Sequence, residues 1–206
     1  LLNTDDDGSV GNNALVPEPG SKGAGVYKYI IEERYHIACF EETRRPAGRI
    51  VTDETVTFAS GTLDGKGGVD MVFNIMCPIV CKMHNCNDDS KIKISESDLT
   101  LCYADYRKMI VHVQTVAFSL LVVGLHVLDQ NYSEDERSQW WNDTNICIDK
   151  YLNPRDRVIF FADVNGKVGS IITSAIGGHQ ADAQDDNGRC FHEMLLKYKC
   201  CLPATL

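Results

Sequence analysis

The stretch VIFFADVNGKVGS, residues 158–170, decides how this sequence is interpreted. Five apolar or small residues run directly into Asp163, Asn165 and Gly166. Such a run favours a buried strand, and because alternate side chains of a strand share a face, Asp163 and Asn165 point to the same side. A carboxylate and an amide at the carboxyl end of a strand lie where α/β folds bind ligands. A simple turn at Asn165 and Gly166 explains the same residues without any ligand.

The composition describes an acidic chain of 206 residues with a net charge of −9. This length corresponds to one domain and suffices for a substantial core. The negative charge argues against a protein that coats nucleic acid through bulk charge, but it leaves room for an enzyme that reaches a phosphate chain through a bound cation. Nine cysteines, an odd number, without a signal-peptide pattern favour reduced thiols in an intracellular setting, nuclear or cytoplasmic.

The first half of the chain divides into an arm, a helix and several strands. Residues 1–24 are rich in Gly, Asn, Asp and Pro and predict a flexible arm ahead of a domain that covers residues 25–206. A helix is expected over 26–35, strands over 36–44, 49–60 and 67–75, and a polar loop over 82–100. The apolar stretch 109–128 is long enough to span a membrane, but its β-branched residues and the break near Gln114 favour two core strands. No membrane partner is therefore expected.

The second half of the chain predicts two helices around the strand at residue 158. The clearer helix covers 133–152, where Ser133 and Glu136 match a capping box and Pro154 follows the end. The last helix is expected to have Asn187 as its N-cap and to turn Phe191 and Leu195 inward. The order of helix, strands, helix, strand and helix predicts an α/β chain whose sheets are covered by helices.

Two other predicted strands also end in polar groups. Glu41 and Glu42 follow the apolar residues HIACF, and a carboxylate in that place could bind a hard cation, because Mg²⁺ sites need only one or two carboxylates. His126 ends the strand SLLVVGLH. Each has a plain structural alternative, namely two solvated acids ahead of a basic loop and a hydrogen-bonded histidine.

Taken in order, these segments resemble the endonuclease/exonuclease/phosphatase superfamily, whose members have the DNase I-like fold. CFEETR at 39–44 is similar to the family's QET strand end, GGVDMVF at 67–73 to its second strand, VVGLHVL at 122–128 to the strand that ends in His or Tyr, and FADVNGKVGS at 161–170 to its GDFN motif. The segment 185–205, DDNGRCFHEMLLKYKCCLPAT, resembles a helix and strand of the reverse-transcriptase-linked endonucleases of LINE-type retroelements. The resemblance covers about residues 26–205.

This resemblance implies an α/β fold, an incomplete DNase I-like sandwich of two packed β-sheets flanked by helices. It also implies a Mg-dependent phosphodiesterase that cleaves DNA or another phosphodiester, with Mn as a possible substitute. Carried over by position, Glu42 would ligate the cation, Asp163 would orient or deprotonate the attacking water, Asn165 would hold the phosphate, and His126 would contact it. Glu41 stands where the family has Gln and puts a second acid near the metal.

The sequence also departs from the family pattern. Ala162 and Val164 replace the first Gly and the aromatic residue of the GDFN motif. The family's first strand and its C-terminal SDH motif have no counterpart between Leu1 and Leu206, so the domain is expected to be incomplete at both ends and to hydrolyse its substrate very weakly or not at all. An inactive remnant that serves as a binding or scaffold module is therefore an alternative, and a phosphatase of the same superfamily is another. The sequence identifies no protein partner.

Overall fold

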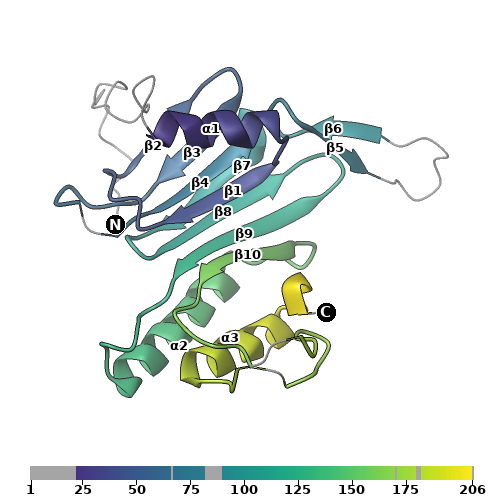
Figure 1. The fold of residues 1–206 in the computed structure, drawn as a ribbon. Coiled ribbons are helices and arrows are strands. Elements are labelled where there is room, and N and C mark those ends of the chain that lie inside the picture. The colour runs from purple at the N-terminus through teal and green to yellow at the C-terminus, as the bar shows by residue number, and fades with distance from the viewer. Residues whose placement is uncertain (1–21, 66, 82–89, 170, 180–181, 206) are drawn as a thin grey trace.

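A computed structural model describes residues 22–65, 67–81, 90–169, 171–179 and 182–205 (Figure 1). Two four-stranded sheets pack face to face, and helices lie on the outer side of each sheet. This is the α/β sandwich that the sequence predicted. Residues 1–21, which make up most of the predicted arm, lie outside the described residues, and the first helix already begins at Lys22.

The first sheet is antiparallel throughout and has the order β1-β4-β3-β2. Its strands are β1 (Ile37–Glu41), β2 (Gly48–Val51), β3 (Thr55–Ala59) and β4 (Val69–Asn74). Helix α1 (Lys22–Glu32) lies across the side of this sheet that faces away from the second sheet, with Ile30 buried (Figure 1). The single strand predicted over 49–60 is wrong. The Thr52 hydroxyl accepts bonds from the backbone amides of Glu54 and Thr55, and this turn makes a hairpin of β2 and β3.

The second sheet is mixed and has the order β10-β9-β8-β7. Its strands are β7 (Leu99–Ala104), β8 (Lys108–Gln114), β9 (Ser119–His126) and β10 (Arg157–Asp163), and only β9 and β10 run parallel. The stretch 109–128 therefore forms two strands, as predicted. Within the described part of the chain, no helix combines the length and the apolar character needed to cross a membrane.

A small hairpin extends from the sandwich. In the sequence it lies between the strands of the first sheet and those of the second. It consists of β5 (Pro78–Cys81) and β6 (Ser90–Lys93), and the short 3₁₀ turn η2 (Glu96–Asp98) follows. The prediction of a loop over 82–100 is therefore wrong for residues 90–93 and 96–98, and also for residues 99 and 100, with which the next strand begins. Residues 82–89 lie outside the described residues. Strand β6 was missed because only one of its four residues, Ile92, is apolar.

Helices α2 (Glu134–Tyr151) and α3 (Asp186–Lys197) cover the outer face of the second sheet (Figure 1). The predicted capping box at Ser133 and Glu136 is present. The predicted N-cap of α3 is wrong, because the Asp185 carboxylate accepts a bond from the Gly188 amide at 2.8 Å. Asn187 lies inside the helix and is buried. The short turn η3 (Pro203–Thr205) ends the described chain.

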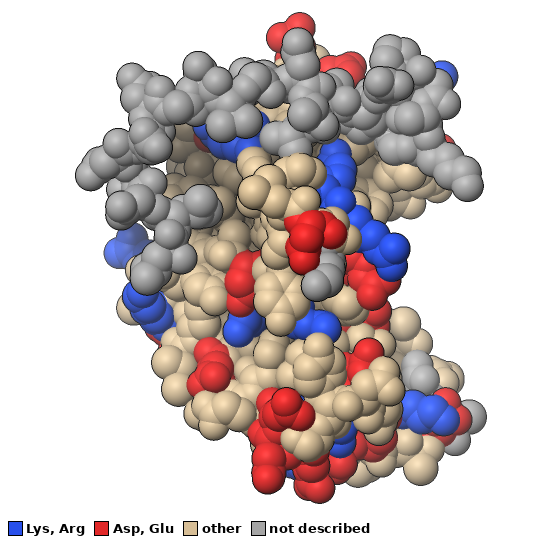
Figure 2. All heavy atoms as spheres, turned by 90° about the vertical axis from the view of Figure 1, so that its left-hand side faces the viewer, with Lys and Arg blue, Asp and Glu red and all other residues tan. Residues whose placement is uncertain are grey.

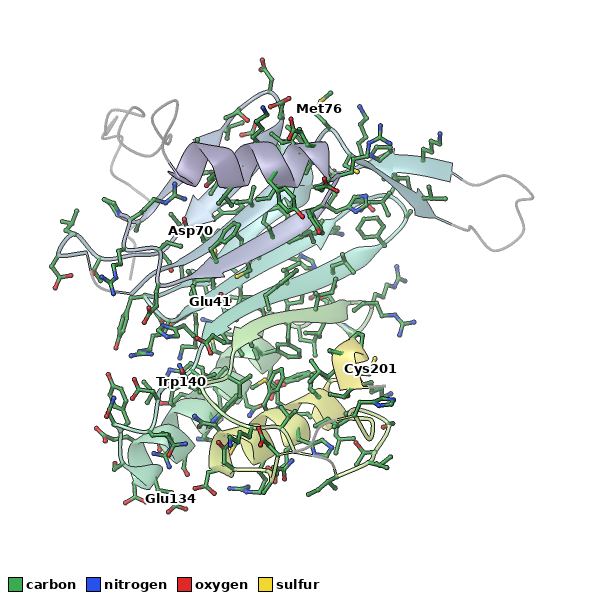
Figure 3. All side chains as sticks on the ribbon, viewed as in Figure 1. Glu41, Asp70, Met76, Glu134, Trp140 and Cys201 are labelled. Carbon is green, nitrogen blue, oxygen red and sulfur yellow. The ribbon has the colours of Figure 1, made fainter. Side chains whose placement is uncertain are left out.

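Apolar side chains fill two layers, one on each side of the second sheet. Val122 packs between the sheets with Met71 and Phe73, whereas its neighbours Leu121 and Val123 pack against α2 and α3. Trp140 lies between the second sheet and α2 (Figure 3). Because β9 is buried on both faces, its residues 120–125 are all apolar or Gly, and this explains the second part of the apolar stretch 109–128.

Candidate functional site

Strands β1, β9 and β10 end at the same edge of the sandwich. Their last residues are Glu41, His126 and Asp163. In each strand the residue two positions earlier faces the other sheet: Cys39 and Phe161 pack in the layer between the sheets, and Gly124 lies against Cys39. Because alternate strand residues share a face, all three polar side chains are directed toward the gap between the sheets. Figure 2 faces this edge, where acidic and basic side chains lie side by side.

His126 occupies the middle of this edge. It is the direct partner of Asp163 on the parallel ladder, which continues through a bond from the Val127 amide to the Asp163 carbonyl at 2.9 Å. The Nε2 atom of His126 lies 3.6 Å from Oε1 of Glu42. The residue is only 7% exposed, and its buried Nδ1 has no hydrogen-bond partner among the described groups. The structure thus places Glu42 beside His126, and His126 beside Asp163 on the ladder.

Glu42 reaches this place because the chain leaves the strand conformation immediately after β1. Its φ of 53° lies in the left-handed region, which breaks the alternation of side chains, and 59% of its side chain is exposed. The loop that follows is tied to the first sheet: the Thr43 hydroxyl and the Arg45 Nε donate to the two oxygens of buried Asp70, at 2.9 and 2.8 Å. Figure 3 labels Asp70 in that sheet. Two successive acids can therefore face one site.

Glu41 lies close enough to Asp163 for their negative charges to interact. Burial raises the pKa of Glu41, hydrogen bonds from a backbone amide and from Cys39 oppose this shift, and the negative charge of Asp163 raises the pKa further. Figure 3 shows Glu41 at the end of β1 that borders the gap between the sheets. Two neighbouring carboxylates, one of them half-buried, repel each other, and a cation between them would relieve that repulsion.

Asn165 lies in the turn directly after β10. Its φ is 46°, its backbone amide donates to Oδ1 of Asp163 at 3.1 Å, and its side-chain Nδ2 donates to the Val127 carbonyl at 2.9 Å. The side chain therefore ties the end of β10 to the end of β9. One hydrogen of the Asn165 amide group is used in this bond, and the second is available to another acceptor.

Asn187 in α3 supports the turn that contains Asn165, a role that was not predicted from the sequence. Its Nδ2 donates to the carbonyls of Leu128 and Asn165, at 2.9 and 3.1 Å, and its Oδ1 accepts from Nε1 of Trp141 at 3.1 Å. Gly188 lets the helix approach closely, because a Cβ there would lie 1.8 Å from the Lys167 carbonyl oxygen. The first turn of α3 thus positions the loop that carries Asn165.

A pocket of about 320 Å³ opens beside His126 at the same edge. Its lining comes from both sheets and consists of Glu42, Thr62, Asp64, Gly67, Tyr106, Arg107, His126 and Tyr132. Arg107 was not predicted from the sequence, because a lone arginine in the turn between two strands has no pattern that marks it.

The carboxylates of the site suit a hydrated magnesium ion. Within the ranges that the structure describes, no three or more His, Cys, Asp and Glu side chains are grouped so that they could hold a metal ion. Mg²⁺ needs fewer protein ligands than that, because it keeps several waters and binds through one or two carboxylates. Glu42 beside His126 and Glu41 near Asp163 are donors of this kind. The residues present therefore fit the ion.

Comparison with known proteins defines the class of fold. No protein-family model and no curated protein sequence matches the chain. Among solved structures, it is similar to the endonuclease domain of TRAS1, a telomere-specific non-LTR retrotransposon, with 15% identity and a TM-score of 0.51 over 85% of this chain and 64% of that domain. Truncated TDP2 from Caenorhabditis elegans is also similar, with 15% identity and a TM-score of 0.38 over 68% of this chain and 53% of that one.

The chain thus has a DNase I-like fold, which confirms the fold predicted from its motifs. It spans less than two thirds of the length of either neighbour. At 15% identity this likeness defines the fold, and the chemistry of the site depends on the residues described above.

Proposed function

We propose that this chain is a Mg²⁺-dependent phosphodiesterase domain of the DNA endonuclease type, of retroelement origin, whose hydrolysis is weak. The observation that carries the proposal is the convergence of Glu42, His126 and Asp163 at the carboxyl ends of β1, β9 and β10. The similar TRAS1 domain is an endonuclease of a retrotransposon, and this supports DNA as the substrate.

Asp163 is proposed to act on the attacking water. Its side chain is exposed, and its Oδ1 already accepts the Asn165 amide. The other carboxylate oxygen can accept a hydrogen bond from water, which orients the water for in-line attack and takes its proton as the bond to phosphorus forms. The opposite P–O bond breaks in the same displacement, and the leaving oxygen takes a proton from solvent. A carboxylate that is fixed on one side by its own turn has few orientations to lose in this step.

His126 and Asn165 are proposed to bind the phosphate. Nε2 of His126 faces the open side of the site, where it also approaches Glu42, and Asn165 has a second amide hydrogen to donate. Donors that are held in place before the reaction stabilise the negative charge that builds on the phosphate oxygens in the transition state. The bonds from Asn165 to Val127 and from Asn187 to Asn165 provide that rigidity.

Glu42 is proposed to hold the Mg²⁺ ion, with Glu41 as a second acid nearby. When bound, the ion neutralises phosphate oxygens and acts as a Lewis acid. Mn²⁺ takes the same oxygen ligands and is expected to replace it. The exposed side chain of Glu42 leaves room for the waters that Mg²⁺ retains.

A pair of small substrates tests the class of reaction. We expect hydrolysis of the diester bis(p-nitrophenyl) phosphate in Mg²⁺ or Mn²⁺, loss of hydrolysis in EDTA, and little hydrolysis of the monoester p-nitrophenyl phosphate. Preference for the monoester would replace this proposal with a phosphatase. Hydrolysis of neither substrate, together with retained binding of DNA, would indicate a binding module that no longer cleaves.

A further inference from the structure

The pocket beside His126 contains one arginine that the proposed chemistry does not use. Arg107 lies in the turn between β7 and β8, and it lines the pocket together with His126, Tyr106 and Tyr132. A guanidinium beside the strand ends suits a second anionic group of a substrate, because its planar fork of donors matches a phosphate.

Arg107 is held firmly in its place. One terminal nitrogen, Nη1, donates to the carbonyls of His126 and Val127, at 3.3 and 3.4 Å, and Nη2 donates to the Tyr132 hydroxyl at 3.3 Å. Its guanidinium carbon also lies 5.5 Å from the ring centre of Tyr106 and 5.4 Å from that of Tyr132. These contacts fix the positive charge against the end of β9, the strand that ends in His126.

Two buried nitrogens at this pocket lack hydrogen-bond partners among the described groups. They are Nε of Arg107 and Nδ1 of His126. A buried polar atom without a partner is costly, so such atoms are uncommon unless they serve a site. Both belong to side chains that line the same pocket, and Nε of Arg107 can donate to an acceptor oxygen.

The opposite wall of the pocket is part of the first sheet's β3–β4 loop, and it is fastened to the turn that carries Arg107. The Gly68 amide donates to the Tyr106 carbonyl at 2.8 Å. Gly67 has a φ of 57°, and a Cβ there would lie 2.8 Å from the same carbonyl oxygen. The pocket is therefore formed before any ligand arrives, because its two walls are bonded together.

The charges around the pocket restrict where an anion could lie. Glu42 and Asp64 also line it and repel an anion, and the Thr62 hydroxyl donates to Asp64. An anion therefore fits against Arg107 and His126 and not against the acidic wall. The two acids instead suit a cation that is bound to the same anion, so binding should depend on a divalent metal.

We propose that this pocket binds a phosphate group that flanks the scissile phosphodiester, and that Arg107 positions a polynucleotide through it. This inference rests on the proposed function and names its substrate class, a nucleic-acid chain with phosphates on consecutive nucleotides. A single small diester offers no second phosphate, so the phosphate contact proposed for Arg107 acts on the binding of DNA and not on the binding of bis(p-nitrophenyl) phosphate.

Fluorescence anisotropy with a short labelled duplex DNA tests the proposal. Ca²⁺ replaces Mg²⁺ in the titration, because it takes oxygen ligands as well. Arg107→Ala is expected to weaken binding about tenfold and to reduce the slope of log K against log salt by about 1. Arg155→Ala is the matched control, since it removes the same charge from an exposed site before the first residue of β10, at the opposite end of that strand. Equal weakening by both variants, or by neither, would overturn the proposal.

Arg107→Lys separates binding from folding. Lysine keeps the charge but loses the planar fork, so its affinity should lie between those of the wild type and Arg107→Ala. Melting temperatures are measured for each variant. If Arg107→Ala does not fold, the DNA affinity of Arg107→Lys tests the proposal instead. Wild-type affinity for DNA in a folded lysine variant would refute it.

The two proposals can fail separately. Binding of DNA that depends on Arg107, without hydrolysis of any diester, would leave the pocket assignment intact and refute the catalytic proposal. Hydrolysis of the small diester, with DNA binding that is insensitive to Arg107, would refute the pocket assignment alone.

Discussion

His126 and Asp163 are direct partners on the parallel ladder between β9 and β10. Parallel strands end at the same edge of a sheet, so two polar residues that follow separate apolar runs become neighbours there. Glu42 reaches the same edge from the other sheet, with its Oε1 3.6 Å from Nε2 of His126. The site therefore lies where the two sheets meet, and each sheet contributes a different part of it.

Glu42→Gln should weaken the binding of Mg²⁺ with little effect on folding. The substitution keeps the size of a side chain that is 59% exposed but removes its negative charge. We expect the Mg²⁺ concentration for half-maximal hydrolysis of bis(p-nitrophenyl) phosphate to rise at least about tenfold. Glu54→Gln, in the β2–β3 turn, is the control and should behave as the wild type. An unchanged Mg²⁺ dependence in Glu42→Gln would show that Glu42 is not a ligand.

Glu41→Gln should stabilise the protein at neutral pH. Burial and the charge of Asp163 raise the pKa of Glu41, so the folded protein binds this proton more tightly than the unfolded chain does. The stability that protonated Glu41 contributes is present below its unfolded pKa and is lost as the pH rises through its folded pKa. The variant and the wild type should thus melt at similar temperatures near about pH 4.

At about pH 7 the same variant should melt about 1–2 °C above the wild type. Added Mg²⁺ should narrow this difference, because a bound cation relieves the repulsion between Glu41 and Asp163. Calorimetry at both pH values measures the effect. A variant that is less stable than the wild type at neutral pH would contradict this interpretation of Glu41.

Asn187→Ala should reduce both stability and catalysis. It leaves Nε1 of Trp141 and the carbonyls of Leu128 and Asn165 without their buried partner, at a cost of about 3 kcal/mol. At a temperature where the variant is folded, kcat should fall, because the turn that carries Asn165 loses its support. Asn142→Ala, on the exposed side of α2, is the control. A loss of stability with an unchanged kcat would limit Asn187 to a structural role.

Ser133→Ala should lower the melting temperature without changing hydrolysis. The Ser133 hydroxyl accepts the Glu136 amide at 3.3 Å, and the Glu136 carboxylate accepts the Ser133 amide at 2.9 Å. We expect a decrease of about 2–4 °C at neutral pH. The bonds from Ser133 lower the pKa of Glu136, so the stability they contribute is present above the unfolded pKa and is lost as the pH falls through the folded one. A decrease in melting temperature that is larger in acid than at neutral pH would contradict this role of the capping box.

The sequence predicted those parts of the fold in which local pattern and tertiary structure agree. The apolar runs at 120–125 and 158–162 form strands, and the capping box begins α2 where expected. The hairpin of β2 and β3 was missed because its turn contains neither Gly nor Pro. The start of α3 was misplaced because Asp185, Asp186 and Asn187 are all good N-caps, and only the buried contacts of Asn187 exclude it from that role.

The candidate site was predicted only for residues at the ends of strands. Glu42, His126 and Asp163 were found because each follows an apolar run, and the sheet topology then brings them together. The proximity of Glu41 to Asp163 depends on how the two sheets pack, and the place of Arg107 depends on carbonyls and rings from distant segments. Contacts of this kind have no periodic signal in the sequence.

Nicking of supercoiled plasmid DNA tests the central claim most directly, with wild type and Asp163→Ala compared in Mg²⁺ and in EDTA. The wild type should convert supercoiled plasmid to the open-circular form in Mg²⁺ and not in EDTA, and Asp163→Ala should retain no more than about 1% of that rate. Equal nicking by the two proteins would contradict the role of Asp163. No nicking by a folded wild type would contradict catalysis at this site.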